Sequence, residues 1–342
     1  MRIVVTGGAG FLGFHLARGL AGDHQVVLLD RAGIPPAERG ATAAAIQGDV
    51  RDRTLLRRTL AGAGAVVHAA AGLPLWKPAE IRSVNVEGTR AVLEVARELG
   101  VPRVLHVSST AVYGIPDHHP LTEDDPLDGV GPYGESKVEA EGLVARARDA
   151  GQVVPVVRPK TFVGPERLGV FQILFEWIRE GRRIPLIGDG RNRYQLLDVE
   201  DLVAAVRLLL ELPPAQANVT CNVGAGEFGT VAEDLGALFA HAGTGSRILP
   251  VPAPLAKGCL AVLGALRLSP LYRWVWGTAD QDSWVDCSRL RALGWEPRWS
   301  NAGSLIRTWD WYREHHAELR AAGTGHRNPW REGALGLLRR LL

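Results

Sequence analysis

The sequence predicts an α/β protein with a doubly wound parallel sheet and a smaller second domain toward the C-terminus. Two observations predict it. Apolar runs alternate with amphipathic helical patterns, and the strand-like runs are continuously apolar rather than alternating. Strands of that kind are buried on both faces, which is typical of a parallel sheet covered by helices. With 342 residues, the chain is long enough for one large domain or two modest ones.

The predicted strands are short runs of mainly aliphatic residues. Before residue 160 they are expected over residues 2–7, 24–30, 44–50, 64–71, 103–110 and 152–159. The helices expected between them cover residues 11–21, 53–62, 85–100 and 133–150. Gly100 has the position of a C-terminal capping glycine for the third helix. Helices between consecutive strands provide the crossovers that parallel pairing needs.

After residue 160 the alternation is less regular. Residues 169–181 predict a helix, residues 184–206 a short strand, a turn and another helix, and residues 218–224 a further strand. The change in rhythm indicates a second domain that is not a continuation of the first sheet.

These patterns predict the domain boundaries. Residues 1–160 are expected to bind a dinucleotide, with the chain returning to this domain around 190–225. Residues 161–320 are expected to form mainly a substrate-binding lid domain, and residues 321–342 a tail. The tail has leucines on one helical face, which favours packing on its own domain or a partner chain. Contact with a membrane surface is the alternative.

Composition excludes several classes of protein. The net charge is +2 and no basic tract stands out, so we expect no nucleic-acid partner. No segment reaches the roughly 18 apolar residues of a membrane span. The three cysteines, Cys221, Cys259 and Cys287, are far apart and lack metal-ligand spacing. They predict reduced thiols in a cytoplasmic protein without a metal site.

The stretch "VVTGGAGFLGFHL" at residues 4–16 joins the first strand to the first helix. In this context Gly7 suits a tight turn, Gly10 lets the backbone approach a pyrophosphate, and Gly13 lets the helix pack on the sheet. Phe11 and Leu12 begin the helix, whose N-terminus attracts phosphate. The stretch therefore predicts a dinucleotide-binding loop.

The end of the second predicted strand indicates which dinucleotide is bound. Asp30 can accept hydrogen bonds from the ribose hydroxyls, and its charge repels a 2′-phosphate. This favours NAD over NADP. Arg31 follows directly and is able to bind a 2′-phosphate, so NADP stays open as the alternative.

The segment "YGESK" places Tyr133 and Lys137 one turn apart on a helix. A tyrosine with the ordinary pKa of about 10 is a weak base at neutral pH, and a nearby ammonium lowers that pKa. Tyr133 would then exchange a proton with a substrate hydroxyl, while Lys137 also binds the nicotinamide ribose. Ser109, at the end of the fifth strand, would bind the same substrate oxygen.

Taken together, these motifs resemble the extended short-chain dehydrogenases, which include NAD-dependent epimerases and dehydratases and 3β-hydroxysteroid dehydrogenase-like proteins. The resemblance rests on "TGGAGFLG", Asp30, "GDV" at 48–50, "HAAA" at 68–71, "NVEGT" at 85–89, "SSTAVYG" at 108–114, "YGESK" at 133–137, "RPKTFVGP" at 158–165 and "LGWEP" at 293–297. It implies a Rossmann domain with a smaller substrate domain, a bound NAD(P), a homodimer and a catalytic triad of Ser109, Tyr133 and Lys137.

The resemblance also implies further cofactor contacts. By it, Asp49 and Val50 lie at the adenine, and Ala69, Ala70 and Ala71 line the cofactor.

The predicted substrate contacts depart from the nucleotide-sugar pattern. Sugar 4,6-dehydratases of the resembled family carry an Asp-Glu pair where this chain has Thr110 and Ala111. Sugar-nucleotide epimerases carry a diphosphate-binding arginine at the position of Tyr194, and Arg193 beside it is the alternative ligand. Thr110, Lys160, Arg193 and Tyr194 are therefore the candidate substrate residues.

The sequence predicts an NAD-dependent oxidoreductase that transfers hydride at a secondary alcohol or ketone carbon of a small molecule. A nucleotide-sugar epimerase, which oxidises a sugar carbon transiently with retained NAD, is the first alternative. A non-catalytic dinucleotide sensor on the same fold is the second.

Overall fold

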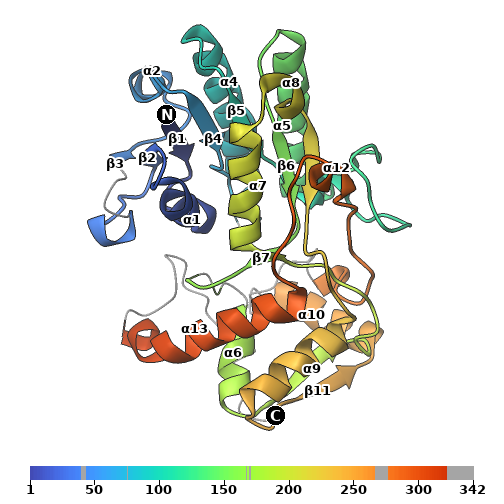
Figure 1. Cartoon of the computed structure of the whole chain (residues 1–342). Coiled ribbons are helices and arrows are strands. Elements are labelled where there is room, and N and C mark those ends of the chain that lie inside the picture. Colours follow the sequence, from blue (N-terminus) through green and yellow to red (C-terminus); the bar gives the residue numbers. More distant parts are fainter. Residues whose placement is uncertain (40–43, 75, 167, 169–170, 266–275, 322–342) are drawn as a thin grey trace. The chain divides into compact units, whose positions relative to one another are not determined.

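The computed structural model describes the chain apart from residues 40–43, 75, 167, 169–170, 266–275 and 322–342 (Figure 1). The predicted tail thus falls almost entirely outside the described residues. The chain forms two compact units from separated segments. Unit 1 consists of residues 1–160, 199–224 and 285–296; unit 2 consists of residues 161–198, 225–284 and the segment that begins at Pro297.

Unit 1 is built on a sheet of seven parallel strands in the order β10-β6-β5-β4-β1-β2-β3. The strands are β1 (Arg2–Thr6), β2 (Gln25–Asp30), β3 (Ala44–Gln47), β4 (Ala65–His68), β5 (Val104–Val107), β6 (Val156–Pro159) and β10 (Thr220–Val223). Their aliphatic side chains are buried, as continuous apolar runs predict. The sheet and its helices confirm the predicted Rossmann-like α/β class.

Helices cover both faces of this sheet (Figure 1). One face carries α1 (Phe11–Leu20) and α7 (Val199–Glu211), which pack side by side. The other carries α2 (Arg53–Leu60), α4 (Gly88–Glu98) and α5 (Gly131–Asp149), which share one apolar core with the strands. The shorter helical elements of unit 1 are η1 (Pro36–Glu38), α3 (Pro78–Arg82), η2 (Ser83–Glu87), η3 (Thr110–Tyr113), α8 (Pro214–Ala217) and α12 (Ser288–Arg291).

The helix expected over 85–100 starts differently from the prediction. Residues 83–87 form the π-helical turn η2, and the regular helix α4 begins only at Gly88. The wider turn holds Asn85, which accepts a hydrogen bond from the Gly72 N–H at 2.7 Å and donates one to the Ser136 hydroxyl at 2.9 Å. The π-helical turn joins α3 to α4, and Asn85 connects it to two other segments of unit 1.

Unit 2 has two small parallel sheets and its own apolar core. Strand β8 (Arg183–Ile187) pairs with β11 (Arg247–Val251), and β7 (Phe162–Val163) pairs with β9 (Leu197–Asp198). The helices are α6 (Phe171–Arg179), α9 (Val231–Ala242), α10 (Ala253–Ala265) and α13 (Asn301–Ala321). Phe175, Trp309 and Tyr312 form an aromatic cluster that joins α6 to α13.

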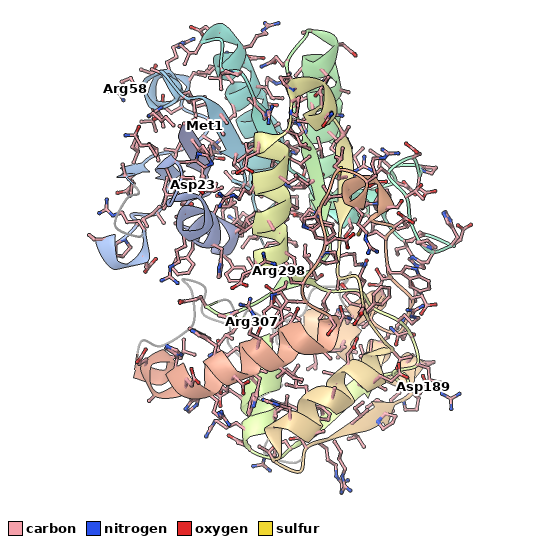
Figure 2. All side chains as sticks on the ribbon, in the orientation of Figure 1. Met1, Asp23, Arg58, Asp189, Arg298 and Arg307 are labelled. Carbon is pink, nitrogen blue, oxygen red and sulfur yellow. The ribbon has the colours of Figure 1, made fainter. Side chains whose placement is uncertain are left out.

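Polar contacts fix α13 within unit 2. Arg307, labelled in Figure 2, pairs with the fully buried Asp198 at 2.7 Å. Asn301 donates to the Asp234 carboxylate on α9 at 2.8 Å. Among the described residues, no helix combines the length and the apolar character that a membrane span requires.

Candidate active site

The strand order of unit 1 marks one place for a ligand. The order reverses between β1 and β4, which are neighbours in the sheet. Open α/β sheets bind ligands beyond the carboxyl ends of the strands at such a point. The glycine loop follows β1 there, and Ala69, Ala70 and Ala71 follow β4.

The loop after β1 is shaped by the absence of side chains. Gly7 has φ +74°, and a Cβ there would lie 2.8 Å from the Ala70 nitrogen. Gly10 donates its N–H to the Gly7 carbonyl at 2.9 Å and caps the N-terminus of α1. A Cβ on Gly13 would collide with the Gly7 carbonyl oxygen. Two separate steric requirements for glycine, at Gly7 and Gly13, therefore meet in one turn.

Helix α1 begins directly after this turn. The side chains of Phe11 and Leu12 are buried, only 4% and 6% exposed, and anchor the helix end in the core. Helix geometry leaves the first N–H groups without acceptors inside the helix, which makes such an end suitable for phosphate. The turn and the helix end fit the pyrophosphate of a dinucleotide.

Asp30 and Arg31, at the end of β2, have different partners. The Asp30 carboxylate accepts hydrogen bonds from the Ala9 N–H at 3.0 Å and the Ala32 N–H at 2.8 Å, which hold it against the glycine turn. Arg31 pairs with two carboxylates, Glu80 at 3.1 Å and Asp49 at 3.5 Å. A negative Asp30 beside an arginine already held by carboxylates suits NAD better than NADP.

Asp49 and Val50 follow β3. Asp49 forms a close ion pair with Arg51 at 2.6 Å, and this pairing lowers the pKa of the carboxyl despite partial burial. Val50 is buried, 5% exposed, and its side chain packs where a Cβ on Gly88 would have to lie. Asp49 is therefore a carboxylate held in place by Arg51 after the end of β3. Val50 beside it is a buried apolar residue that packs against the start of α4.

Tyr133 and Lys137 lie on the first turns of α5. The Lys137 ammonium is 5.9 Å from the centre of the Tyr133 ring and donates to the Val107 carbonyl at 2.9 Å. Lys137 is only 3% exposed, and burial lowers its pKa to about 8, although Glu141 opposes this shift. The lysine is thus a buried, positioned cation directly beside the half-buried tyrosine.

Ser109 is the N-cap of η3, next to the end of β5. Its hydroxyl accepts a hydrogen bond from the Ala111 N–H at 3.2 Å. Gly134 packs so closely on η3 that a Cβ there would lie 2.9 Å from the Ala111 carbonyl oxygen. The segment that carries Ser109 is therefore packed against the helix turn that carries Tyr133 and Lys137.

Two of the predicted substrate residues belong to unit 1. The Thr110 hydroxyl donates to the Pro159 carbonyl at 3.4 Å, which joins η3 to the end of β6. Lys160 follows β6 directly, is 5% exposed, and its burial lowers the pKa to about 7.

The other two belong to unit 2 and face different surroundings. The Arg193 guanidinium lies 4.6 Å from the Phe228 ring and 5.1 Å from the Trp284 ring, and donates to the Phe228 carbonyl at 3.2 Å. The Tyr194 hydroxyl instead pairs with the Thr161 hydroxyl at 3.0 Å. Neighbouring side chains of extended backbone point to opposite sides. Arg193 and Tyr194 therefore have separate sets of partners within unit 2.

Comparison with known proteins gives the family. Residues 3–224 match the model of the NAD dependent epimerase/dehydratase family. The chain belongs to this family. The match confirms the predicted resemblance, the enzyme class and the cofactor NAD.

Several individual proteins are similar to this chain over nearly its whole length. "Uncharacterized protein y4nG" of Sinorhizobium fredii is 34% identical over 98% of this chain and 85% of its own length. A UDP-glucose 4-epimerase of Streptomyces lividans is 29% identical over 92% of this chain and 97% of its own. The crystal structure of a UDP-glucose 4-epimerase of Thermotoga maritima with UDP-glucose, 24% identical, has a TM-score of 0.77 and covers 92% of this chain and all of its own. That likeness shows the fold.

The sequence analysis did not identify the residues that hold the candidate catalytic segments in place. Asn85 bonds to Ser136 on α5, between Tyr133 and Lys137. Glu141, one turn beyond Lys137, accepts hydrogen bonds from Ser108 and Arg158. Asn85, Ser108 and Arg158 all lie inside motifs that carry the family resemblance. Their place in these motifs is the sequence feature that could have identified them.

Proposed function

We propose that the chain is an NAD-dependent oxidoreductase that transfers hydride at a secondary alcohol or ketone carbon of a small molecule. One observation carries the proposal. Within unit 1, Tyr133 and the buried Lys137 lie on one helix face, and the segment of Ser109 packs on the same turn. The glycine turn at the carboxyl end of β1 belongs to the same unit.

Each of the three residues has a defined part in this reaction. NAD, when bound, supplies the hydride acceptor. Tyr133 removes the hydroxyl proton of the alcohol, or returns it to the ketone in the reverse direction. The Lys137 ammonium stabilises the phenolate form of Tyr133 electrostatically and binds the ribose, and Ser109 orients the substrate oxygen by a hydrogen bond.

A nucleotide-sugar epimerase is the second candidate, and the relatives named above support it. It would use the same three residues. The observation that favours the oxidoreductase lies in unit 2. Where sugar-nucleotide epimerases carry an arginine, Tyr194 pairs with Thr161, and this neutral hydroxyl pair offers no positive charge to a diphosphate.

Localisation and assembly are also proposed. None of the cysteines, all of which lie in the described part, forms a disulfide. This usage supports a reducing compartment, and we propose the cytoplasm. The homodimer rests on the family resemblance alone, and sedimentation of the purified enzyme tests it.

Turnover by the purified enzyme tests the function. NADH absorbance and the products are followed with a panel of secondary alcohols, their ketones and UDP-glucose. We expect net NADH formation with an alcohol, and a loss of about 10²–10⁴-fold in kcat for Tyr133→Phe with NADH binding retained.

Other outcomes contradict the proposal. Conversion of UDP-glucose to UDP-galactose with retained NAD and no net NADH would establish the epimerase instead. Equal NAD affinity and equal biological output of the wild type and Tyr133→Phe would support the non-catalytic sensor.

A further inference from the structure

The end of β5 is held by two side chains that lie one turn apart on α5. Lys137 donates its ammonium hydrogen to the Val107 carbonyl at 2.9 Å. Glu141 accepts a hydrogen bond from the Ser108 hydroxyl at 2.5 Å. The next residue along the chain is Ser109. The same helix face thus presents Tyr133, Lys137 and Glu141 at intervals of four residues, a spacing that keeps side chains aligned.

The anchoring of Ser108 determines where Ser109 points. Ser109 has extended backbone, with φ −163° and ψ 151°. Neighbouring side chains of extended backbone point to opposite sides. Because the Ser108 hydroxyl is directed at α5 by Glu141, the Ser109 hydroxyl is directed away from that bond, where it accepts the Ala111 N–H.

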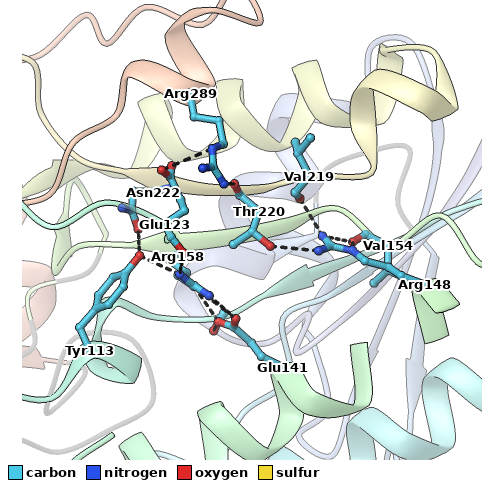
Figure 3. A network of polar contacts seen from close by, with 11 residues as sticks. Tyr113, Glu123, Glu141, Arg148, Val154, Arg158, Val219, Thr220, Asn222 and Arg289 are labelled. Carbon is cyan, nitrogen blue, oxygen red and sulfur yellow. Dashed lines mark hydrogen bonds and ion pairs between the residues drawn. The ribbon is translucent and has the colours of Figure 1, made fainter. Parts of the chain in front are cut away.

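Glu141 is itself fixed by a buried arginine. Arg158 on β6 donates from Nε at 3.0 Å and from Nη2 at 2.6 Å, and the two side chains are only 6% and 8% exposed. On its other side Arg158 donates to the Tyr113 hydroxyl at 2.8 Å, and Tyr113 donates to Asn222 on β10 at 2.7 Å. Figure 3 shows the Glu141 carboxylate and the Arg158 guanidinium facing each other, with Tyr113 and Asn222 beyond.

We propose that Glu141 is a positioning residue of the active site: it places a carboxylate one turn from Lys137 on α5 and holds the Ser108–Ser109 end of β5 against α5. The proposal rests on the proposed function, because it presumes that Lys137 and Ser109 act on cofactor and substrate. Its hydrogen-bond partners are Ser108 and Arg158, so it would act through other residues of the site.

The charged and titratable groups around Lys137 explain why a carboxylate matters there. From α5 it is faced by Tyr133 and Glu141, from β4 by His68 and from β5 by His106. Burial, assisted by the Lys137 charge, lowers the pKa of His68 to about 3 and that of His106 well below its usual value, so both are neutral. Glu141 is the group that opposes the effect of burial on Lys137.

The experiment measures NADH affinity by fluorescence between about pH 6 and pH 10. In the wild type we expect affinity to fall as Lys137 loses its proton. In Lys137→Met, NADH affinity should not decrease with rising pH. Glu141→Gln should shift its midpoint to lower pH by about half a unit to one unit, because the amide no longer stabilises the ammonium.

Arg103→Met is the matched control. Arg103 is also buried, and it donates to the Leu209 and Leu212 carbonyls at 2.6 and 2.7 Å, at the end of α7. The Arg103→Met variant should be less stable than the wild type, but the pH midpoint of its NADH affinity should be unchanged. Where Glu141→Gln fails to fold because Arg158 is left unpaired, the double variant Glu141→Gln/Arg158→Gln should show the same direction of shift.

Two results would overturn the inference: a midpoint in the Glu141 variants equal to that of the wild type, or a fall in affinity that persists in Lys137→Met. The proposed function fails separately. If the midpoints shift as expected but no alcohol or ketone is turned over, the inference about Glu141 stands and the oxidoreductase proposal falls.

Discussion

At the scale of single residues, the cofactor loop depends on glycine for reasons of space. A Cβ on Gly13 would collide with backbone atoms of Gly7 and Gly8, which have no side chain to move aside. An added methyl group at Gly13 could therefore fit only if the backbone of the turn moved. Displacement of the turn moves the helix end that is expected to receive phosphate.

Gly13→Ala should reduce NADH affinity by about tenfold or more and lower the free energy of unfolding by about 1–3 kcal/mol. Fluorescence titration and urea unfolding measure the two effects. Gly22→Ala is the control, because a Cβ at Gly22 meets no atom within 4 Å. Unchanged NADH affinity in Gly13→Ala would contradict the assignment of the loop.

The same scale separates what was predictable from what was not. The glycine loop and Asp30 could be predicted because the loop follows, and Asp30 ends, a strand that is recognisable from the local sequence. Glu141 and Arg158 are 17 residues apart, and Tyr113 and Asn222 are 109 apart. Only the completed sheet brings such partners together, so no local pattern could have paired them.

At the scale of elements, helix ends are fixed by specific side chains. Helix α9 begins with a capping box in which the Thr230 hydroxyl accepts from the Glu233 N–H at 3.2 Å and Glu233 accepts from the Thr230 N–H at 2.7 Å. Both bonds satisfy donors that the helix leaves without partners. The cap therefore contributes to the stability of unit 2.

Thr230→Ala should lower the free energy of unfolding by about 1 kcal/mol, because the first turn loses its acceptor. Thr230→Ser keeps the hydroxyl and should stay close to the wild type. Urea unfolding of the three proteins checks both statements, and equal stability of the alanine and serine variants would refute them.

Elements were predicted well where apolar runs are long. They were predicted poorly where a short segment belongs to a unit whose other residues are far away in the sequence. The strands of the sheet were located by their aliphatic residues. The return of residues 285–296 to unit 1 was not, and they had been assigned to the lid domain. This segment has no continuous apolar run; its Leu290 and Trp295 are buried singly, and Trp295 donates to the Asp201 carbonyl.

At the scale of the whole molecule, unit 1 buries several bases. Burial lowers the pKa of His68 to about 3, of Lys137 to about 8 and of Lys160 to about 7, and that of His106 well below its usual value. In the unfolded chain these groups bind protons at their ordinary, higher pKa values. The unfolded state therefore holds more protons between the two values, and stability rises with pH across that window.

The free energy of unfolding should consequently increase by on the order of 2 kcal/mol between about pH 6 and pH 8.5, mainly through Lys160 and Lys137. The predicted gain ends near pH 8.5 because of Cys221 and Cys287. Burial raises the pKa of both thiols to about 12, so at higher pH they ionise in the unfolded chain before they do in the folded one. Their ionisation stabilises the unfolded state and opposes a further gain in stability.

Urea unfolding of the wild type and Lys160→Met at the two pH values checks this. The variant should gain less stability with pH. An equal gain in both proteins would show that Lys160 is not held as a buried base.

The assembly of unit 1 from three segments has a consequence for its synthesis. When a ribosome has made residues 1–160, β6 is still the edge of the sheet, because its neighbour β10 has not been translated. An unpaired apolar edge is prone to associate with other chains. The dinucleotide-binding unit is therefore finished only after much of unit 2 has emerged, and a fragment that stops at residue 160 is an unfinished sheet rather than a separable domain.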